Sequence, residues 1–360
     1  MKMQKIYELM DRADSAYIMH KGKLTFEISP NDKYYLEGNE IIFGTEEPLI
    51  AYKTNRDNYF RFQTVYADDG SSIDRIPLKN LYKVISTYNI GYVLVKNIAK
   101  FVEITNNMYI KKEQNLSGKE MASREFARLY VEIIDRLDEV YEKMKVKWVK
   151  KVVDNYMNSL VYTKGKAFKK ETAKSSLKLR LDQLSDYVVN LEAGALLCEE
   201  GDQENEMFIL NRGNLEVYIG GKKVATIVES GTVIGEMALL LGEKRTATIK
   251  ALTSCNITII KPENLREIAS GNSDFFLNVA VNMGRRLEHN CSLIRGTEDL
   301  LEESETEALP AAPKEKTNYR ELTALLNELE TYDAKYKLDW LSDLLKYSRS
   351  EIAQIRKLSQ

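Results

Sequence analysis

The feature that most constrains this chain is a pair of short motifs, Gly-Glu-Met-Ala-Leu at residues 235–239 and Arg-Thr-Ala at residues 245–247. They lie between two runs that are expected to form strands, residues 223–228 and 246–251. A glycine and an acid before a short apolar segment predict a helix start, whose unpaired N–H groups attract an anion. Arg245 is close enough to fold back over the same anion, and its planar guanidinium suits a phosphate. The acid would then need a hydroxyl partner, such as that of a ribose. The segment predicts a pocket for a sugar that carries a phosphate.

The stretch 235–248 resembles the phosphate-binding cassette of cyclic nucleotide-binding domains. The family pattern is Gly-Glu-apolar-Ala-Leu, a few variable residues, usually a proline, then Arg, a small or hydroxyl residue, and Ala. The spacing from acid to arginine is intact, and Lys244 stands where proline is common. The alternative is a chance match on an unrelated β-roll, which the combination of acid, arginine and flanking strands makes the weaker interpretation. Further stretches that resemble the family are residues 199–202, 206–210, 212–213, 262–265 and 275–287, together with Gly231.

The resemblance implies a jelly roll over residues 171–297 that binds a cyclic purine nucleotide, cAMP or cGMP, and needs no cofactor. Its phosphate would be held by Arg245 and the backbone of residues 235–238, and its ribose by Glu236. Helices after Pro262 would cap the base. Thr246 resembles the position where cGMP-reading members carry a hydroxyl, but some cAMP-reading members carry one too, and we lean slightly to cAMP. The ligand-binding residues expected on this basis are Gly235, Glu236, Met237, Ala238, Arg245, Thr246 and Ala247.

The amino-acid composition limits which other functions and locations are expected for this chain. A chain of 360 residues can hold two or three domains, and its formal net charge of −2 gives no global field for nucleic acid. Three scattered cysteines and two distant histidines show no metal or triad spacing, so no catalytic site is expected. No signal peptide and no apolar run of about 18 residues is found, so we expect a cytoplasmic protein without a transmembrane segment.

Residues 1–80 contain short apolar runs broken by turn-forming residues, which predicts a β-rich region. Residues 16–26 align with residues 207–217, and this indicates a possible degenerate copy of the nucleotide domain. The alternative is that any two hairpins look alike over eleven residues. In the first copy Thr45 stands near the position of Glu236, and the stretch that follows offers Lys53 and Arg56 without the Arg-Thr-Ala frame. We expect this region not to bind a nucleotide.

Residues 81–170 have a helical period and are expected to connect the two β-rich parts. Apolar residues at spacings of three and four predict one long helix over residues 126–148. We favour packing of this helix inside its own chain, and the alternative is a coiled-coil dimer seam. The basic run 143–180 contains aromatic residues, which favours a solvated helix face; binding of single-stranded nucleic acid is the alternative.

Residues 298–318 are acidic and contain prolines, which predicts a disordered linker. Residues 319–360 are expected to form a helical tail. A winged helix-turn-helix needs roughly sixty to seventy residues with a turn glycine, and the tail is too short and has no glycine. We therefore expect no DNA binding.

The expected fold class is α+β: the jelly roll with flanking helices, preceded by the β-rich region and the long helical segment. The leading function is a non-enzymatic cyclic nucleotide sensor, a regulatory protein with one intact pocket. It would signal through its helices to a protein partner or by self-association. The alternative is a structural or interaction scaffold in which the pocket is vestigial.

Overall fold

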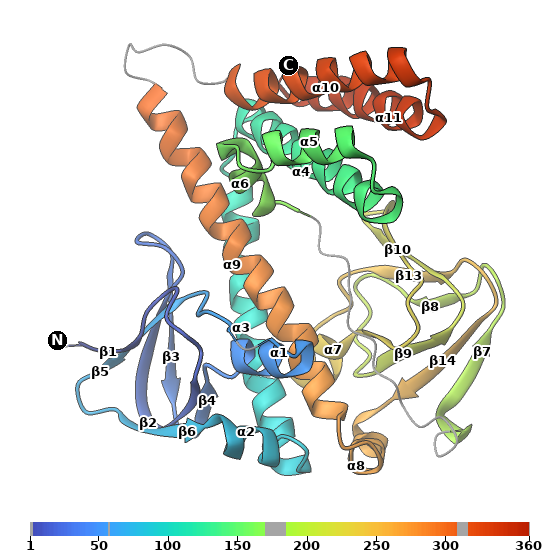
Figure 1. Ribbon diagram of the computed structural model, residues 1–360. Helices are drawn as coiled ribbons and strands as arrows, with labels where there is room; N and C mark the ends of the chain where they lie inside the picture. The colour runs from blue at the N-terminus through green and yellow to red at the C-terminus, as the bar shows by residue number, and fades with distance from the viewer. Residues whose placement is uncertain (1–2, 57, 170–184, 308–315, 360) are drawn as a thin grey trace. The chain divides into compact units, whose positions relative to one another are not determined.

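The chain folds into two units, each assembled from two separate stretches of sequence (Figure 1). The computed structural model describes residues 3–56, 58–169, 185–307 and 316–359. Because each unit takes a second stretch from far along the chain, this division differs from the five consecutive segments expected from the sequence. Unit 1 comprises Met1–Asn106 and Thr172–Glu288, and unit 2 comprises Asn107–Glu171 and His289–Gln360.

The N-terminal part of unit 1 is an antiparallel sheet built around one long strand, β2. Strands β1, β5, β2 and β3 are neighbours in that order, and β4 and β6 pair with the first half of β2. Large apolar side chains such as Phe26 and Phe43 are fully buried, which explains why the aromatic and β-branched runs form strands here. The strands are β1 (Met3–Tyr7), β2 (Ser15–Glu27), β3 (Lys33–Gly38), β4 (Ile41–Phe43), β5 (Thr64–Asp68) and β6 (Ser72–Pro77).

The second β-rich part of unit 1 is a sandwich of two four-stranded antiparallel sheets (Figure 1). One sheet has the order β11-β10-β13-β8 and the other β12-β9-β14-β7. Residues from both sheets, such as Leu215 and Phe208, share one buried core. The α+β class with a β-sandwich and flanking helices is confirmed. The strands are β7 (Val188–Leu191), β8 (Leu196–Cys198), β9 (Met207–Arg212), β10 (Leu215–Ile219), β11 (Lys222–Ile227), β12 (Thr232–Ile234), β13 (Thr248–Ala251) and β14 (Cys255–Ile260), after a short 3-10 turn, η2 (Ser185–Tyr187).

The two β-rich parts share one pairing scheme. The long strand β2 corresponds to β9 and β10 taken together. Strands β4 and β6, which pair with its first half, correspond to β12 and β14. Strands β3 and β5, which pair with its second half, correspond to β11 and β13. Most residue partners correspond, and so do the register shifts in the β1–β5 and β8–β13 pairs. Two differences are a register shift between Val217 and Tyr218 in the β10–β11 pair, which the β2–β3 pair lacks, and the pairing of β7 with β14, which has no counterpart among the described strands of the N-terminal sheet. The difference in residue number between corresponding residues of β2 and of β9 or β10 is the same as in the alignment of residues 16–26 with residues 207–217. Corresponding pairs are Tyr17–Phe43 and Phe208–Ile234, Leu24–Leu36 and Leu215–Ile227, and Leu24–Ala67 and Leu215–Ala251.

Helices of unit 1 pack closely on one another and on the strands. Phe101 of α3 lies 5.1 Å from Phe26 of the N-terminal sheet, between ring centroids. A Cβ on Gly91 of α3 would come within 2.4 Å of the Phe276 ring of α9, so this close approach requires glycine. These helices are α1 (Glu46–Thr54), α2 (Leu78–Val84), α3 (Tyr88–Glu113), α7 (Glu236–Leu241), α8 (Pro262–Gly271) and α9 (Phe275–Glu307); α3 and α9 continue into unit 2.

Unit 2 is a helical bundle whose core is rich in leucine and valine (Figure 1). Helix α4 begins behind a capping box, in which Ser117 and Glu120 satisfy each other's backbone N–H groups. Its apolar face packs on α5, α6, α10 and α11 within the same chain, as expected from its seam. The elements are α4 (Gly118–Met144), α5 (Lys147–Tyr156), α6 (Leu160–Lys166), α10 (Lys316–Tyr336), α11 (Asp339–Ile355) and η3 (Arg356–Ser359).

Two expectations for the helical regions need correction. The helix expected over residues 126–148 is broken, because Lys145 has a left-handed backbone (φ 52°) between α4 and α5. The disordered linker expected over residues 298–318 is helical at both ends, in α9 and α10, while residues 308–315 lie outside the described residues. The helical tail forms as expected, and its leucine seam is buried in unit 2. The leucines of that seam are Leu322, Leu325, Leu326 and Leu329.

Candidate functional site

The turn between β12 and α7 requires glycine at residue 235 for two reasons. Gly235 has a left-handed backbone (φ 76°), which L side chains rarely adopt. A Cβ at this residue would also lie 2.2 Å from Nη1 of Arg245. The glycine therefore lets the start of α7 and the Arg245 guanidinium occupy neighbouring positions, as the cassette pattern predicts.

Arg245 is a buried cation with unused hydrogen-bond donors. Only 5% of the residue is exposed, and its Nη1 donates to the Glu206 carbonyl at 2.7 Å. The guanidinium carbon lies 4.6 Å from the centre of the Phe208 ring. Its Nε and Nη2 atoms are buried and have no hydrogen-bond partner among the described residues. Because a buried unpaired donor is costly, this arrangement fits a site that is completed by an anion.

The backbone of Arg245 is fixed by the loop that precedes β9. Its N–H donates to the carbonyl of Asp202 at 2.8 Å, and its carbonyl accepts from Gly201 N–H at 2.8 Å. These two bonds hold the arginine in place although Lys244 replaces the usual proline before it. The side chain is therefore positioned by the sandwich and needs no ligand to bring it there.

Glu236 is also buried, but its carboxylate already has a partner. Its residue exposure is 6%, and Nη1 of Arg286, on helix α9, donates to its Oε1 atom. The side chain of Arg286 is 45% exposed, so the pair joins a buried acid to a base at the surface. Sequence reasoning missed Arg286, because no motif marks this arginine, which lies 50 residues after Glu236 on helix α9.

The other predicted residues contribute differently. Ala238 is buried, and its N–H donates to the Gly235 carbonyl at 3.2 Å, so this donor is used inside the turn. Met237 and Ala247 are half-buried, and Thr246 is exposed. The structure thus brings Gly235, Glu236, Ala238 and Arg245 together around the start of α7. Their binding role stays a prediction.

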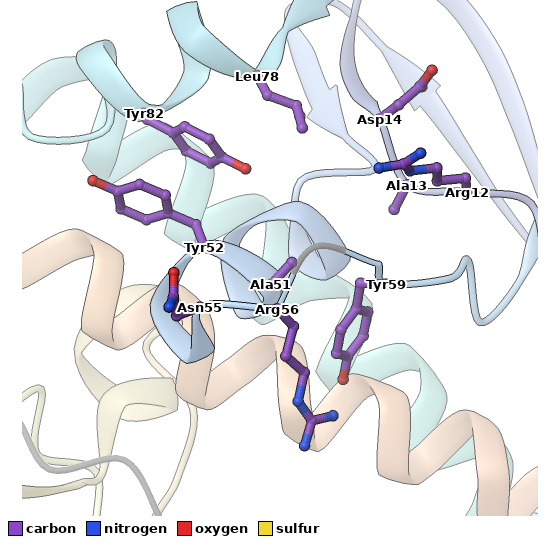
Figure 2. Close-up of a pocket in the computed structure, with 10 residues that line it drawn as sticks. All are labelled: Arg12, Ala13, Asp14, Ala51, Tyr52, Asn55, Arg56, Tyr59, Leu78 and Tyr82. Carbon is purple, nitrogen blue, oxygen red and sulfur yellow. The ribbon is translucent and has the colours of Figure 1, made fainter.

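A separate cavity of about 410 Å³ lies in the N-terminal part of unit 1, and Figure 2 shows the residues around it. None of its lining residues belongs to the cassette. The rings of Tyr52 and Tyr82 stack with their centroids 4.1 Å apart, and the Tyr59 hydroxyl donates to Glu288 at 2.7 Å. The cavity is therefore distinct from the site that the sequence predicts. Its lining residues are Arg12, Ala13, Asp14, Ala51, Tyr52, Asn55, Arg56, Tyr59, Leu78 and Tyr82.

The aromatic residues of the basic run are engaged inside unit 2. Trp148 stacks on Tyr332 with a centroid distance of 4.3 Å, and the Tyr162 hydroxyl donates to Asp135 at 2.9 Å. This packing favours a solvated helix face for residues 143–169 of the run, while residues 170–180 lie outside the described residues.

The requirements of a metal site, a disulfide and a membrane-spanning helix are not met by the described residues. Within them, no group of three or more His, Cys, Asp or Glu side chains is arranged to hold a metal ion. Cys198, Cys255 and Cys291 are buried and free of disulfides. No helix in the described part of the chain is long and apolar enough to cross a membrane.

Comparison with known sequences supports the same segment. Residues 188–272 match a family model described as cyclic nucleotide-binding domain. A curated relative is an isozyme 2 form of cGMP-dependent protein kinase of Drosophila melanogaster. It is 35% identical over 82 residues, which are 23% of this chain and 7% of the kinase. The match therefore covers a small part of that protein.

Solved structures give weaker matches. One described as "Sp-2Cl-cAMPS bound to PKAR CBD2" is 27% identical and covers 24% of this chain and 60% of that chain, with a TM-score of 0.22. Another, described as "cAMP bound PfPKA-R", is 19% identical and covers 76% and 73%, with a TM-score of 0.26. Because both scores are low, the family assignment rests on the family model and the kinase segment.

Proposed function

Residues 188–272 of this chain form a cyclic nucleotide-binding domain, and on that premise we propose that the protein is a non-enzymatic sensor of cAMP or cGMP. The observation that carries the proposal is Arg245, a buried guanidinium whose Nε and Nη2 lack partners among the described residues. A nucleotide phosphate would satisfy both donors with charge-assisted hydrogen bonds.

The ribose would bind Glu236, where a ribose hydroxyl and the guanidinium of Arg286 would compete for the same carboxylate. Arg286 already donates to this carboxylate. A ribose hydroxyl that donates to the same carboxylate would weaken or replace the Arg286 contact, so nucleotide binding would change the attachment of α9. A ligand can shift such an equilibrium only through its different affinities for the two states, and the Glu236–Arg286 pair supplies one such difference.

Helix α9 is the proposed route of output. It carries Arg286 and continues from unit 1 into unit 2. A changed α9 would act on a protein partner or on self-association through the helices. Cysteines that are buried and form no disulfide are in keeping with a cytoplasmic location.

The test is a calorimetric titration of the full chain with cAMP and with cGMP, and with 5′-AMP for comparison. We expect one site per chain, with cAMP the tighter ligand. Arg245→Ala should weaken binding by roughly ten- to a hundredfold, since a hydrogen bond to a charged group contributes about 1.5–3 kcal/mol. The matched control is Arg212→Ala, an exposed arginine at the end of β9, which should leave affinity unchanged. Equal affinity of wild type and Arg245→Ala would contradict the pocket assignment.

The scaffold alternative is favoured by one observation, the neutralisation of Glu236 by Arg286. If that pair has replaced the ligand, neither cyclic nucleotide will bind at millimolar concentration. The same titration therefore decides between the two functions.

A further inference from the structure

The N-terminal sheet contains a counterpart of Arg245 that the sequence does not reveal. Arg61 precedes β5 by the same number of residues by which Arg245 precedes β13, and β5 and β13 pair identically with their neighbours. Arg61 donates to the carbonyl of Ser15, the residue before the Ala16–Ile76 pair. Arg245 donates to the carbonyl of Glu206, the residue before the equivalent Met207–Ile260 pair. Lys53 and Arg56, which the sequence offers for this role, do not hold it.

The two arginines differ in what occupies their remaining donors. Nη1 of Arg61 donates to Oε2 of Glu47 at 2.9 Å and to the Gly44 carbonyl at 2.8 Å. Arg61 and Glu47 are each at most 1% exposed, and Glu47 Oε1 also accepts from Phe62 N–H at 3.4 Å. Of the guanidinium nitrogens of Arg61 only Nε has no partner among the described residues, whereas Arg245 leaves Nε and Nη2 unpaired.

Glu47 occupies the position of a small residue in the cassette. Gly44 and Gly235 are equivalent, because both follow the strand that pairs with Tyr17 or Phe208, and both have positive φ, 63° and 76°. Glu47 is the third residue after Gly44, as Ala238 is the third after Gly235. Ala238 has only a methyl group and so offers no carboxylate to Arg245. The glutamate at the same position reaches its arginine.

An aromatic ring fills more of the same space. Tyr7 pairs with Val65 beyond a register shift, as Cys198 pairs with Ile249 beyond an equivalent shift. A tyrosine in the N-terminal sheet therefore stands where the sandwich has a small cysteine. Tyr7 is 5% exposed, and the centre of its ring lies 4.2 Å from the Arg61 guanidinium carbon.

We propose that residues 3–77 are a second copy of the nucleotide-binding fold in which the Glu47 carboxylate occupies, on Arg61, the place that a ligand phosphate takes on Arg245. Glu47 is a built-in ligand, and Tyr7 closes the space beside it. The copy is a latent anion site: it excludes phosphate as long as Glu47 is present. The comparison with a ligand phosphate rests on the proposed function, but the occupation of Arg61 by Glu47 does not.

The experiment measures thermal unfolding of the full chain in inorganic phosphate against chloride of equal ionic strength. All variants carry Arg245→Ala, so that the site at Arg245 in the β-sandwich cannot respond to phosphate. Arg245→Ala alone should show no phosphate effect. Adding Glu47→Ala should create one, a rise in midpoint of about 2–4 °C at phosphate ten times its Kd. Adding Arg61→Ala as well should abolish it. The matched control, Glu46→Ala with Arg245→Ala, removes the neighbouring buried acid and should show no gain.

A folded Glu47→Ala variant without a phosphate response would overturn the proposal. If Glu47→Ala does not fold, titration of the Arg245→Ala chain with cAMP and phosphate decides. Binding that Arg61→Ala then removes would mean that the N-terminal copy is open, and its absence supports the closed copy. Failure of the proposed function has a separate signature, because it leaves the wild-type chain without nucleotide binding whatever the Glu47 variants do.

Discussion

The carboxylate of Glu236 is shared between a surface arginine and, in the proposed sensor, the ligand. Arg286→Ala removes the competing donor and leaves the acid free for a ribose hydroxyl. We expect nucleotide affinity to rise about three- to tenfold, a modest gain because the 45% exposed arginine is screened by solvent. Calorimetric titration at low and high salt measures it. The control is Arg285→Ala on the same helix, and weaker binding by Arg286→Ala would show that this arginine holds the ligand.

Glu46 makes stability depend on pH. Burial, followed by the nearby Glu47 charge, raises the pKa of this carboxyl from 4.5 to about 8. Between these two values the folded chain holds a proton that the unfolded chain has lost, so the free energy of unfolding falls as pH rises. The slope is about 1.4 kcal/mol per pH unit for one proton, and it levels off above the folded pKa.

Glu46→Gln should remove this slope and make the variant more stable than wild type near pH 8. Urea denaturation at a series of pH values between 5 and 9 would show it. The control is Glu37→Gln on the exposed side of β3, which should keep the wild-type profile. Parallel profiles for wild type and Glu46→Gln would mean that another group carries the pH dependence.

At this scale the sequence predicts only those residues that stand inside a motif. Gly235, Glu236 and Arg245 are found because their spacing within one turn and helix is local. Arg286 is missed because it reaches the site through the packing of a distant helix. Arg61 is missed for a different reason: the connection through α1 is longer than that through α7, which shifts the arginine out of the expected frame.

Among the helices, sequence periodicity identifies the apolar faces but not the ends. The seam of α4 and the leucines of α10 are buried as their spacing indicates. The break after Met144 is not signalled, because Lys145 takes a left-handed conformation without glycine or proline nearby. The acidic composition of residues 298–307 suggests a linker, yet α9 extends through them, because glutamate has a high helix propensity.

The shared core of unit 2 predicts that the C-terminal helices stabilise α4. Leu325→Ala, at a position with no exposure, should cost about 2–5 kcal/mol. Leu358→Ala, at a position that is 45% exposed, should cost about 0.5 kcal/mol or less. Tryptophan fluorescence during urea denaturation is a selective probe, since Trp148 and Trp340 are the two tryptophans of the chain and both belong to unit 2. Equal midpoints for the two variants would contradict the buried position of α10.

For the whole molecule, the discontinuous units determine what truncation does. A chain that ends at residue 299 loses α10 and α11 and exposes the apolar face of α4, so we expect it to self-associate in light scattering. Its nucleotide affinity should stay within about tenfold of wild type, a coupling of at most roughly 1.4 kcal/mol. A chain that ends at residue 355 lacks only η3 and serves as the control. A monomeric truncated chain with an intact helical signal would show that α4 does not need this cover.

The pairing of Glu47 with Arg61 also bears on the dose–response of the protein. A chain with one open site fills along a simple hyperbola, so going from a tenth to nine tenths occupancy takes about an 81-fold change in concentration. Two open sites on one chain would steepen that curve if they bound ligand with positive cooperativity. An N-terminal copy whose arginine is paired with Glu47 offers no second site for the ligand. In the proposed sensor each chain would then be a graded detector, and any threshold in its response would have to come from the assembly of several chains or from a protein partner.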